Sequence, residues 1–443
     1  MSLRALFRCA VIVPALLLLP LTAQAIEAQK VVSDGGIEAW LVEDHSVPVI
    51  ALEVGFQGGA ALDPADKPGL ANMVSALLDE GAGDLDSLAF QSKLESLAIG
   101  LSFGASQDNF TGSLRTVLEN RDTAFDMLRM ALTQPRFDEE PVSRIRSQIQ
   151  TALSFDLQRP NTIAARRWNE VVFGTHPYAR PVRGTPESIA AITTNDLRTF
   201  VTTRLGRDRM KIGVAGSISP AELKPLLDAT FGGLPKQTAV PPVPDATPAA
   251  KGTVEVIDKA IPQSVAVFGH PGVERHHPDF YPAFVVNHIL GGGGFTARLM
   301  QEVREKRGLA YSVSSSLAAM DHAALVTGGV GTNNARMKES LDLIRAEWAR
   351  MAENGPTAEE LEDAKTYLMG AWPLRFTSTP NVASILASMQ LDGYPIDHLQ
   401  TRNDKVAAVT LEDARRVAAS LLKPDALTIV VVGQPEGIQE ASR

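Results

Sequence analysis

Apolar and polar residues alternate with two different periods along the chain. Four segments have the two-residue period of strands: 36–42, 49–56, 99–106 and 110–118. Four others carry apolar residues three and four positions apart, as helices do: 68–78, 87–97, 121–132 and 141–157. Strands and helices are therefore mixed along the chain, and this mixture predicts an α+β fold.

The second half of the chain repeats the pattern of the first. Residues 189–216 align without gaps with residues 406–433, an offset of 217, and both stretches predict a threonine-capped helix followed by an apolar strand. Val47-Pro48 and Ile261-Pro262 each precede a strand, at the similar offset of 214. The chain is therefore a tandem duplication of an α+β unit of roughly 200 residues.

A proline-rich segment separates the two halves. Residues 232–252 contain five prolines and no core periodicity, which is typical of a semi-rigid linker. The predicted division is a first domain over 26–234, a linker over 235–250 and a second domain over 251–439.

The first residues have the features of a secretion signal. Arg4 and Arg8 precede an apolar run over 10–21, and Ala23-Gln24-Ala25 fits a small-x-small cleavage site. We expect a cleavable signal peptide over 1–25 and a periplasmic mature protein without a stable membrane anchor. An uncleaved anchor is the alternative, although the apolar run is short for a membrane span.

The cysteine content and the net charge limit the kinds of metal site and partner that the chain is expected to have. Cys9 is the only cysteine and lies in the predicted signal, so the mature chain has no disulfide and no thiolate metal ligand. Without Arg4 and Arg8, the 42 basic residues fall to 40 against 51 acidic ones, a net charge of −11. This net charge disfavours nucleic acid as a partner.

The most distinctive stretch is LGGGGFTARLMQEVREKRGLAYSVSSSL, residues 290–317. Four glycines, 291–294, precede a predicted helix that places Phe295, Leu299 and Val303 on one face. Gly308 ends this helix as a C-terminal glycine does, and alternation over 309–315 predicts a strand.

This stretch and the duplicated halves resemble the pitrilysin/insulinase family of zinc metallopeptidases, the inverzincins. The resemblance implies two similar α/β-roll domains, each an antiparallel-dominated sheet packed with helices, which together form one half of a clam-shell peptidase. It also implies a helix in the first half with the motif H-x-x-E-H, where two histidines bind zinc and the glutamate is the general base.

The positions of this motif carry neither the zinc ligands nor the general base. In the equivalent stretch, PGLANMVSALLDEGAG, the two histidines and the glutamate are replaced by Asn72, Ala76 and Ser75. A third glutamate ligand is missing too, because nothing acidic lies between Glu140 and Asp156. No two histidines are four residues apart elsewhere. We predict no metal and no other cofactor in this chain.

The second half keeps the family's arginine and tyrosine, here Arg304 and Tyr311, seven residues apart. In the family such a pair holds the substrate. A phenol can donate a hydrogen bond to the oxyanion that forms in peptide hydrolysis, and a guanidinium can bind a neighbouring carbonyl. The alternative is that Arg304 belongs to a solvated charged run and that Tyr311 is a core residue beside Leu309 and Val313.

The glycines Gly291, Gly292, Gly293 and Gly294 are candidate substrate contacts, because exposed glycine backbone can pair with an extended peptide. In the processing-peptidase branch of the family such a loop touches substrate. The alternative, a phosphate-binding loop, lacks the lysine and hydroxyl that such loops carry.

These features predict a non-catalytic, substrate-binding subunit of a two-chain periplasmic zinc metallopeptidase. A homologous partner chain with H-x-x-E-H would supply zinc and base, and peptides or small proteins would be the substrate. The alternative is a non-enzymatic binding or structural protein that has kept the fold, as core subunits of respiratory complexes have. A self-sufficient peptidase with an unusual metal site has no support in the sequence.

Overall fold

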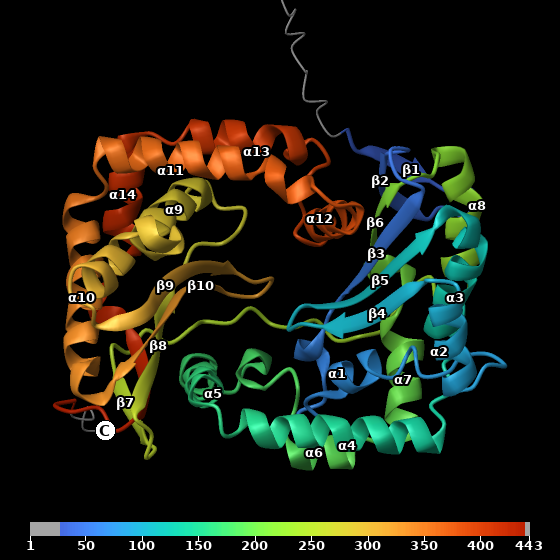
Figure 1. Cartoon of the computed structure of the whole chain (residues 1–443), viewed down its shortest axis with the longest axis horizontal. Coiled ribbons are helices and arrows are strands. Elements are labelled where there is room, and N and C mark those ends of the chain that lie inside the picture. Colours follow the sequence, from blue (N-terminus) through green and yellow to red (C-terminus); the bar gives the residue numbers. More distant parts are fainter. Residues whose placement is uncertain (1–26, 439–443) are drawn as a thin grey trace, which may run out of the picture.

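The computed structural model describes residues 27–438 and contains two β-sheets that face each other across the molecule (Figure 1). The signal peptide predicted over 1–25 lies outside the described residues. Among residues 27–438, no helix combines the length and the apolar character needed to cross a membrane.

Each sheet is formed by one half of the chain, and the two sheets share one strand order apart from an additional edge strand, β1, in the first. In spatial order the first sheet contains β1 (Gln29–Val32), β2 (Glu38–Glu43), β6 (Met210–Gly216), β3 (Val49–Gln57), β5 (Asn109–Val117) and β4 (Gly100–Ala105). The second contains β7 (Val254–Asp258), β11 (Thr428–Gly433), β8 (Gln263–Pro271), β10 (Ala324–Asn333) and β9 (Ala310–Ala319). In each sheet one pair is parallel, β2–β6 and β7–β11, and the other pairs are antiparallel. The predicted α+β duplication is confirmed.

Fourteen α-helices lie in the described part of the chain. Those of the first half are α1 (Leu70–Ser75), α2 (Ser87–Ser96), α3 (Arg121–Thr133), α4 (Glu139–Asp156), α5 (Pro160–Phe173), α6 (Pro186–Ala191), α7 (Thr194–Arg204) and α8 (Pro220–Phe231). Those of the second half are α9 (Phe280–Asn287), α10 (Met337–Asn354), α11 (Ala358–Ala371), α12 (Thr379–Leu391), α13 (His398–Ala407) and α14 (Leu411–Leu421). The repeated helix is α7 in one half and α14 in the other, and Thr193 and Thr410 cap them with the same reciprocal hydrogen bonds to Asp196 and Asp413.

The two halves exchange one helix each. Helix α5, from the first half, packs on β8 and β11 of the second sheet, where Trp168 donates from Nε1 to the Thr428 carbonyl at 2.9 Å. Helix α12, from the second half, packs on β6 and β3 of the first sheet, where Leu386 is buried against Ala51 and Ala215 (Figure 1). The two apolar cores that these helices complete contain residues from both halves, and they join the halves into one body.

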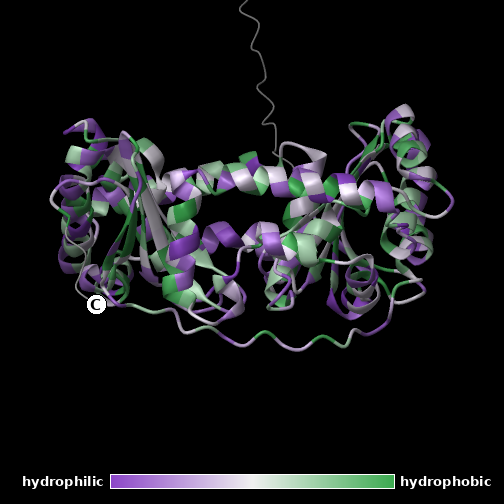
Figure 2. Ribbon diagram, turned by 90° about the horizontal axis from the view of Figure 1, so that it is seen from below, coloured by the Kyte–Doolittle hydropathy of each residue, from purple (hydrophilic) through white to green (hydrophobic). Residues whose placement is uncertain are grey.

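The segment 235–250 contains no helix or strand and runs along one edge of the molecule from one half to the other (Figure 2). It is held by hydrogen bonds from the amides of Ala246 and Ala249 to the carbonyls of His322 and Val172, at 2.8 and 2.9 Å. The proline-rich connection is thus tied to both halves.

Candidate functional site

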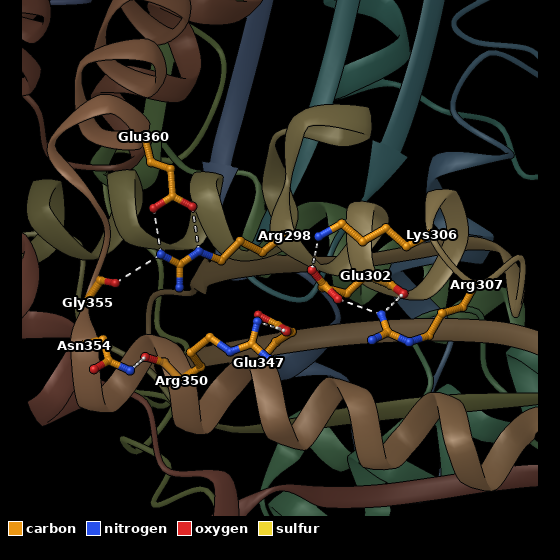
Figure 3. Close-up of polar contacts among 9 residues, drawn as sticks. All are labelled: Arg298, Glu302, Lys306, Arg307, Glu347, Arg350, Asn354, Gly355 and Glu360. Atoms are coloured by element: carbon orange, nitrogen blue, oxygen red, sulfur yellow. Dashed lines mark hydrogen bonds and ion pairs between the residues drawn. The ribbon is translucent and has the colours of Figure 1, made fainter.

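Arg304 lies on a short wide helical turn, η7 (Met300–Glu305), that packs on the apolar core of the second half. Leu299, just before the turn, and Val303, within it, are fully buried in that core. At the start of the turn, Arg298 binds Glu360 of α11 through two hydrogen bonds of 2.7 and 2.6 Å (Figure 3). The backbone that carries Arg304 is therefore firmly anchored.

The predicted apolar face is only partly correct. Leu299 and Val303 are buried as expected, but Phe295 lies outside the helix, in the 3-10 turn η6 (Gly294–Thr296), and is 60% exposed. The reason is the backbone at Gly294, whose φ of +61° turns the chain before the helix begins.

Tyr311 is exposed because of a β-bulge. Gly308 ends the helical turn with φ +60° and donates to the Arg304 carbonyl at 2.7 Å, as predicted. In the pairing of β9 with β10, Ser312 lies opposite Gly331 and Ala310 opposite Thr332, so Tyr311 is the extra residue. A bulge turns its extra side chain away from the regular alternation. Tyr311 is therefore 82% exposed, and the alternative that it is a core residue is wrong.

Arg304 lies between two aromatic rings. Its guanidinium carbon is 4.8 Å from the centre of the Phe295 ring and 4.8 Å from the centre of the Tyr311 ring. A guanidinium over ring faces is attracted by their negative quadrupole, and the stack restricts a long flexible side chain. The structure thus brings Arg304 and Tyr311 together, and adds Phe295 to them.

The next two cations of the run share one carboxylate. Glu302 accepts from Lys306 at 2.5 Å and from Arg307 at 2.6 Å (Figure 3), and both cations lower the pKa of this carboxyl. Arg304 has only a 3.5 Å contact with the adjacent, partly exposed Glu305. Its charge is consequently free to meet an incoming carbonyl or carboxylate.

A surface hollow of about 560 Å³ runs beside the pair. Arg304 and Tyr311 line it together with Gln263, Asn333 and Arg336. The hollow offers a guanidinium and a phenol, both hydrogen-bond donors, on one open face, and it can hold peptide carbonyls.

The four glycines have different environments. Gly291 is buried, in the wide turn η5 (His288–Gly292) that continues α9, and an added Cβ would meet the Ser315 hydroxyl at 2.4 Å. Close packing of η5 on β9 explains this glycine, and Gly291 lacks the exposed backbone that the predicted peptide contact requires. Gly292 and Gly294 are exposed and Gly293 is half-buried, and a role for these three in peptide contact stays a prediction.

The degenerate zinc positions lie on and just after an ordinary, largely buried helix, α1. Ser75 is buried and donates to the Asn72 carbonyl at 2.9 Å, and Ala76 is the residue after the last turn of α1. Asn72, Ser75 and Ala76 offer no imidazole, thiolate or carboxylate, so they do not fit a zinc ion. Within residues 27–438, no three histidines, cysteines or carboxylates are placed to hold a metal.

Comparison with known proteins identifies the family. The model for the insulinase peptidase family M16 matches residues 39–186, and the model for the peptidase M16 inactive domain matches residues 191–368. The chain belongs to peptidase family M16. Its two halves form the pitrilysin-like half of such a peptidase.

Several relatives of this M16 chain match over most of their length. A non-peptidase homologue, YmxG, from Helicobacter pylori is 26% identical over 93% of this chain and 95% of its own. An uncharacterised zinc protease, also named YmxG, from Bacillus subtilis is 23% identical over 88% of this chain and 94% of its own. A crystal structure of a peptidase M16 inactive domain from Pseudomonas fluorescens superposes with a TM-score of 0.87 at 27% identity, covering 94% of this chain and 100% of that one.

Phe295 is the part of this M16 surface that the sequence analysis missed. Its position four residues before Leu299 suggested a core residue, and the local pattern contains no signal of the turn at Gly294. Only the ring contact with Arg304 reveals its place in the site.

Proposed function

We propose that this M16 chain is the non-catalytic, substrate-binding subunit of a two-chain periplasmic zinc metallopeptidase. A homologous partner chain with H-x-x-E-H brings the zinc and the general base, and this chain brings Arg304 and Tyr311. Peptides or small proteins are the substrate.

The observation that carries this proposal is the position of half-buried Arg304 and exposed Tyr311 together in the wall of one open hollow. A stacked arginine without a strong carboxylate partner and an 82% exposed tyrosine contribute little to stability. Both point to contact with another molecule. The loss of ligands at Asn72, Ser75 and Ala76, together with a relative named a non-peptidase homologue, supports assigning catalysis to the partner.

The second candidate is a non-enzymatic binding protein that uses the same fold. It is favoured by the absence of ligands in α1, which it shares with the first proposal. It does not require the chemistry of the Tyr311 hydroxyl, and the two candidates can therefore be separated by removing that hydroxyl.

The test is reconstitution with the partner chain and measurement of kcat and complex formation for variants. Tyr311→Phe removes one donor and leaves the ring that stacks on Arg304. By analogy with other oxyanion donors, kcat should fall about 10²–10³-fold. Arg304→Lys keeps the charge but loses the planar stack and the two-pronged geometry, so it should also impair turnover.

Tyr367→Phe is the matched control, because Tyr367 is 63% exposed on α11 and does not line the hollow. All three variants should fold and bind the partner, since none empties a core. Wild-type turnover by the Tyr311→Phe complex would refute the catalytic contribution and leave this chain as a binding scaffold.

A further inference from the structure

A second, smaller pocket lies where α9, η9 (Pro373–Phe376), α12 and α13 meet. It encloses about 270 Å³ and shares no lining residue with the hollow at Arg304. Aromatic side chains form much of its wall: Phe280, Tyr281, Phe284, Trp372 and Tyr394. This volume is near the lower limit for small-molecule sites, about 300 Å³, and restricts an occupant to roughly one ring.

The pocket has an excess of positive charge. Three arginines line it, Arg275, Arg375 and Arg402, against one carboxylate, Asp392, which pairs with Arg275 at 3.2 Å. Within residues 27–438, neither Arg375 nor Arg402 forms an ion pair with a carboxylate. Two arginine charges are left for an occupant.

The charge of Arg402 costs the folded state more free energy than the charge of Arg375, because only 9% of Arg402 is exposed. Its Nη1 donates to the Leu368 carbonyl at 2.8 Å, and its guanidinium lies 4.9 Å from the Trp372 ring. Burial lowers the pKa of the guanidinium. A buried charge without a counter-ion is unfavourable, and an anion in the pocket would remove that penalty.

His398 adds a polar atom without a partner. The residue is 4% exposed, its ring stacks on Tyr394 at 4.0 Å, and its buried Nδ1 has no hydrogen bond within the described structure. Burial is the largest cause that lowers the pKa of this imidazole to about 4, so the ring is neutral at neutral pH. When Tyr281, 3.3 Å away, donates to Nε2, Nδ1 carries the proton, and this buried N–H is left without an acceptor.

We propose that this pocket binds a carboxylate whose body is a single aromatic or branched apolar group. Arg402 and Arg375 bind the carboxylate, and the aromatic wall encloses the body. A monocarboxylate matches the forked guanidinium, whereas a large hydrated dianion does not suit so small and aromatic a space. The ligand is a free small acid or the C-terminal residue of a peptide.

The test is calorimetric titration of the purified chain with 3-phenylpropionate and with its neutral counterpart, 3-phenylpropanamide. The acid should bind saturably, and the amide should bind at least about tenfold more weakly, because it lacks the charge-assisted hydrogen bonds. Equal binding of acid and amide, or no saturable binding of the acid, would overturn the proposal.

Variants of residues that line the pocket test whether the acid binds there. Ser388→Trp, at an exposed position of α12 that lines the pocket, should fill the space and abolish binding without disturbing a core. Arg375→Gln should weaken binding about tenfold, since it removes one charged partner. Arg415→Gln, which removes an exposed arginine of α14 outside the pocket, should leave binding unchanged. Unaltered binding in Ser388→Trp would place the ligand elsewhere and refute the site.

Two peptides distinguish the sources of the carboxylate. If Ala-Ala-Phe with a free C-terminus binds more tightly than 3-phenylpropionate, and its C-terminal amide does not bind, the site captures peptide C-termini. If only 3-phenylpropionate binds, the site takes free small acids. This experiment uses the chain alone, so its result does not depend on the peptidase proposal.

Discussion

At the scale of single residues, chemistry in this chain is decided by which charges remain uncompensated. Lys306 and Arg307 share the carboxylate of Glu302, and this leaves Arg304 available between two rings. Below the same turn, on α10, Glu347 is fully buried, and neither of its carboxylate oxygens has a hydrogen bond within the described structure. Its charge partner is Arg350, whose Nη1 lies 2.9 Å from Oε1 (Figure 3).

We predict that Glu347→Gln stabilises the protein at neutral pH. Burial raises the pKa of Glu347, which means that the folded state binds the proton more tightly than the unfolded state. The cost of ionisation is therefore absent below the unfolded pKa and grows as the pH rises through the folded pKa. Removing it should contribute about 1 kcal/mol, or roughly 2 °C in Tm.

Thermal unfolding at pH 7.5 and at pH 4.5 tests this prediction. The difference between Glu347→Gln and the unmodified chain should shrink at the lower pH. Glu353→Gln, an exposed position on the same helix, should show little change at either pH. A Glu347→Gln variant that is less stable at pH 7.5 would mean that the pair with Arg350 outweighs the desolvation of the carboxylate.

At the scale of elements, the exchanged helix α12 lies unusually close to the first sheet. A Cβ at Gly213 of β6 would be 2.2 Å from the Ala383 carbonyl oxygen and 2.6 Å from the Ala387 amide nitrogen. Both are backbone atoms of α12 and cannot rotate away. Glycine at this position is thus a requirement of the helix exchange.

We predict that Gly213→Ala destabilises the protein by about 1–3 kcal/mol, the usual cost of overpacking, and loosens α12. The measurement is thermal unfolding combined with hydrogen exchange of the α12 amides. Gly370→Ala on α11 is the control, because its Cβ would meet no atom within 4 Å and alanine favours the helix. Unchanged protection of α12 in Gly213→Ala would contradict the close packing described here.

At the scale of the whole molecule, the chain is one half of an M16 architecture whose own zinc positions do not fit the metal. We predict that the purified chain holds no stoichiometric zinc after dialysis, as measured by elemental analysis. A chelator should leave its Tm unchanged, since the M16 fold here is held by the two exchanged helices and four apolar cores. One tightly bound zinc per chain, or chelator-sensitive peptidase activity of the chain alone, would contradict this prediction.

The sequence by itself determined the features that depend on local pattern. The two periods of apolar residues placed four strands and four helices of the first half, and the offset near 217 residues revealed the duplication. The local sequence also predicted the end of the helix at Gly308 and showed that Asn72, Ser75 and Ala76 replace the zinc ligands and the base. These properties depend on residues close together in the chain, so one sequence is sufficient to predict them.

Only the tertiary structure decided which side chains face solvent and which meet. Tyr311 is exposed because β9 pairs out of register with Gly331 and Thr332 of another strand. The pocket at Arg402 exists because α13 packs on α9, which lies more than a hundred residues earlier in the chain, and α12 closes the pocket beside them. Strand register and helix exchange depend on contacts between distant segments, and periodicity along the chain carries no information about those contacts.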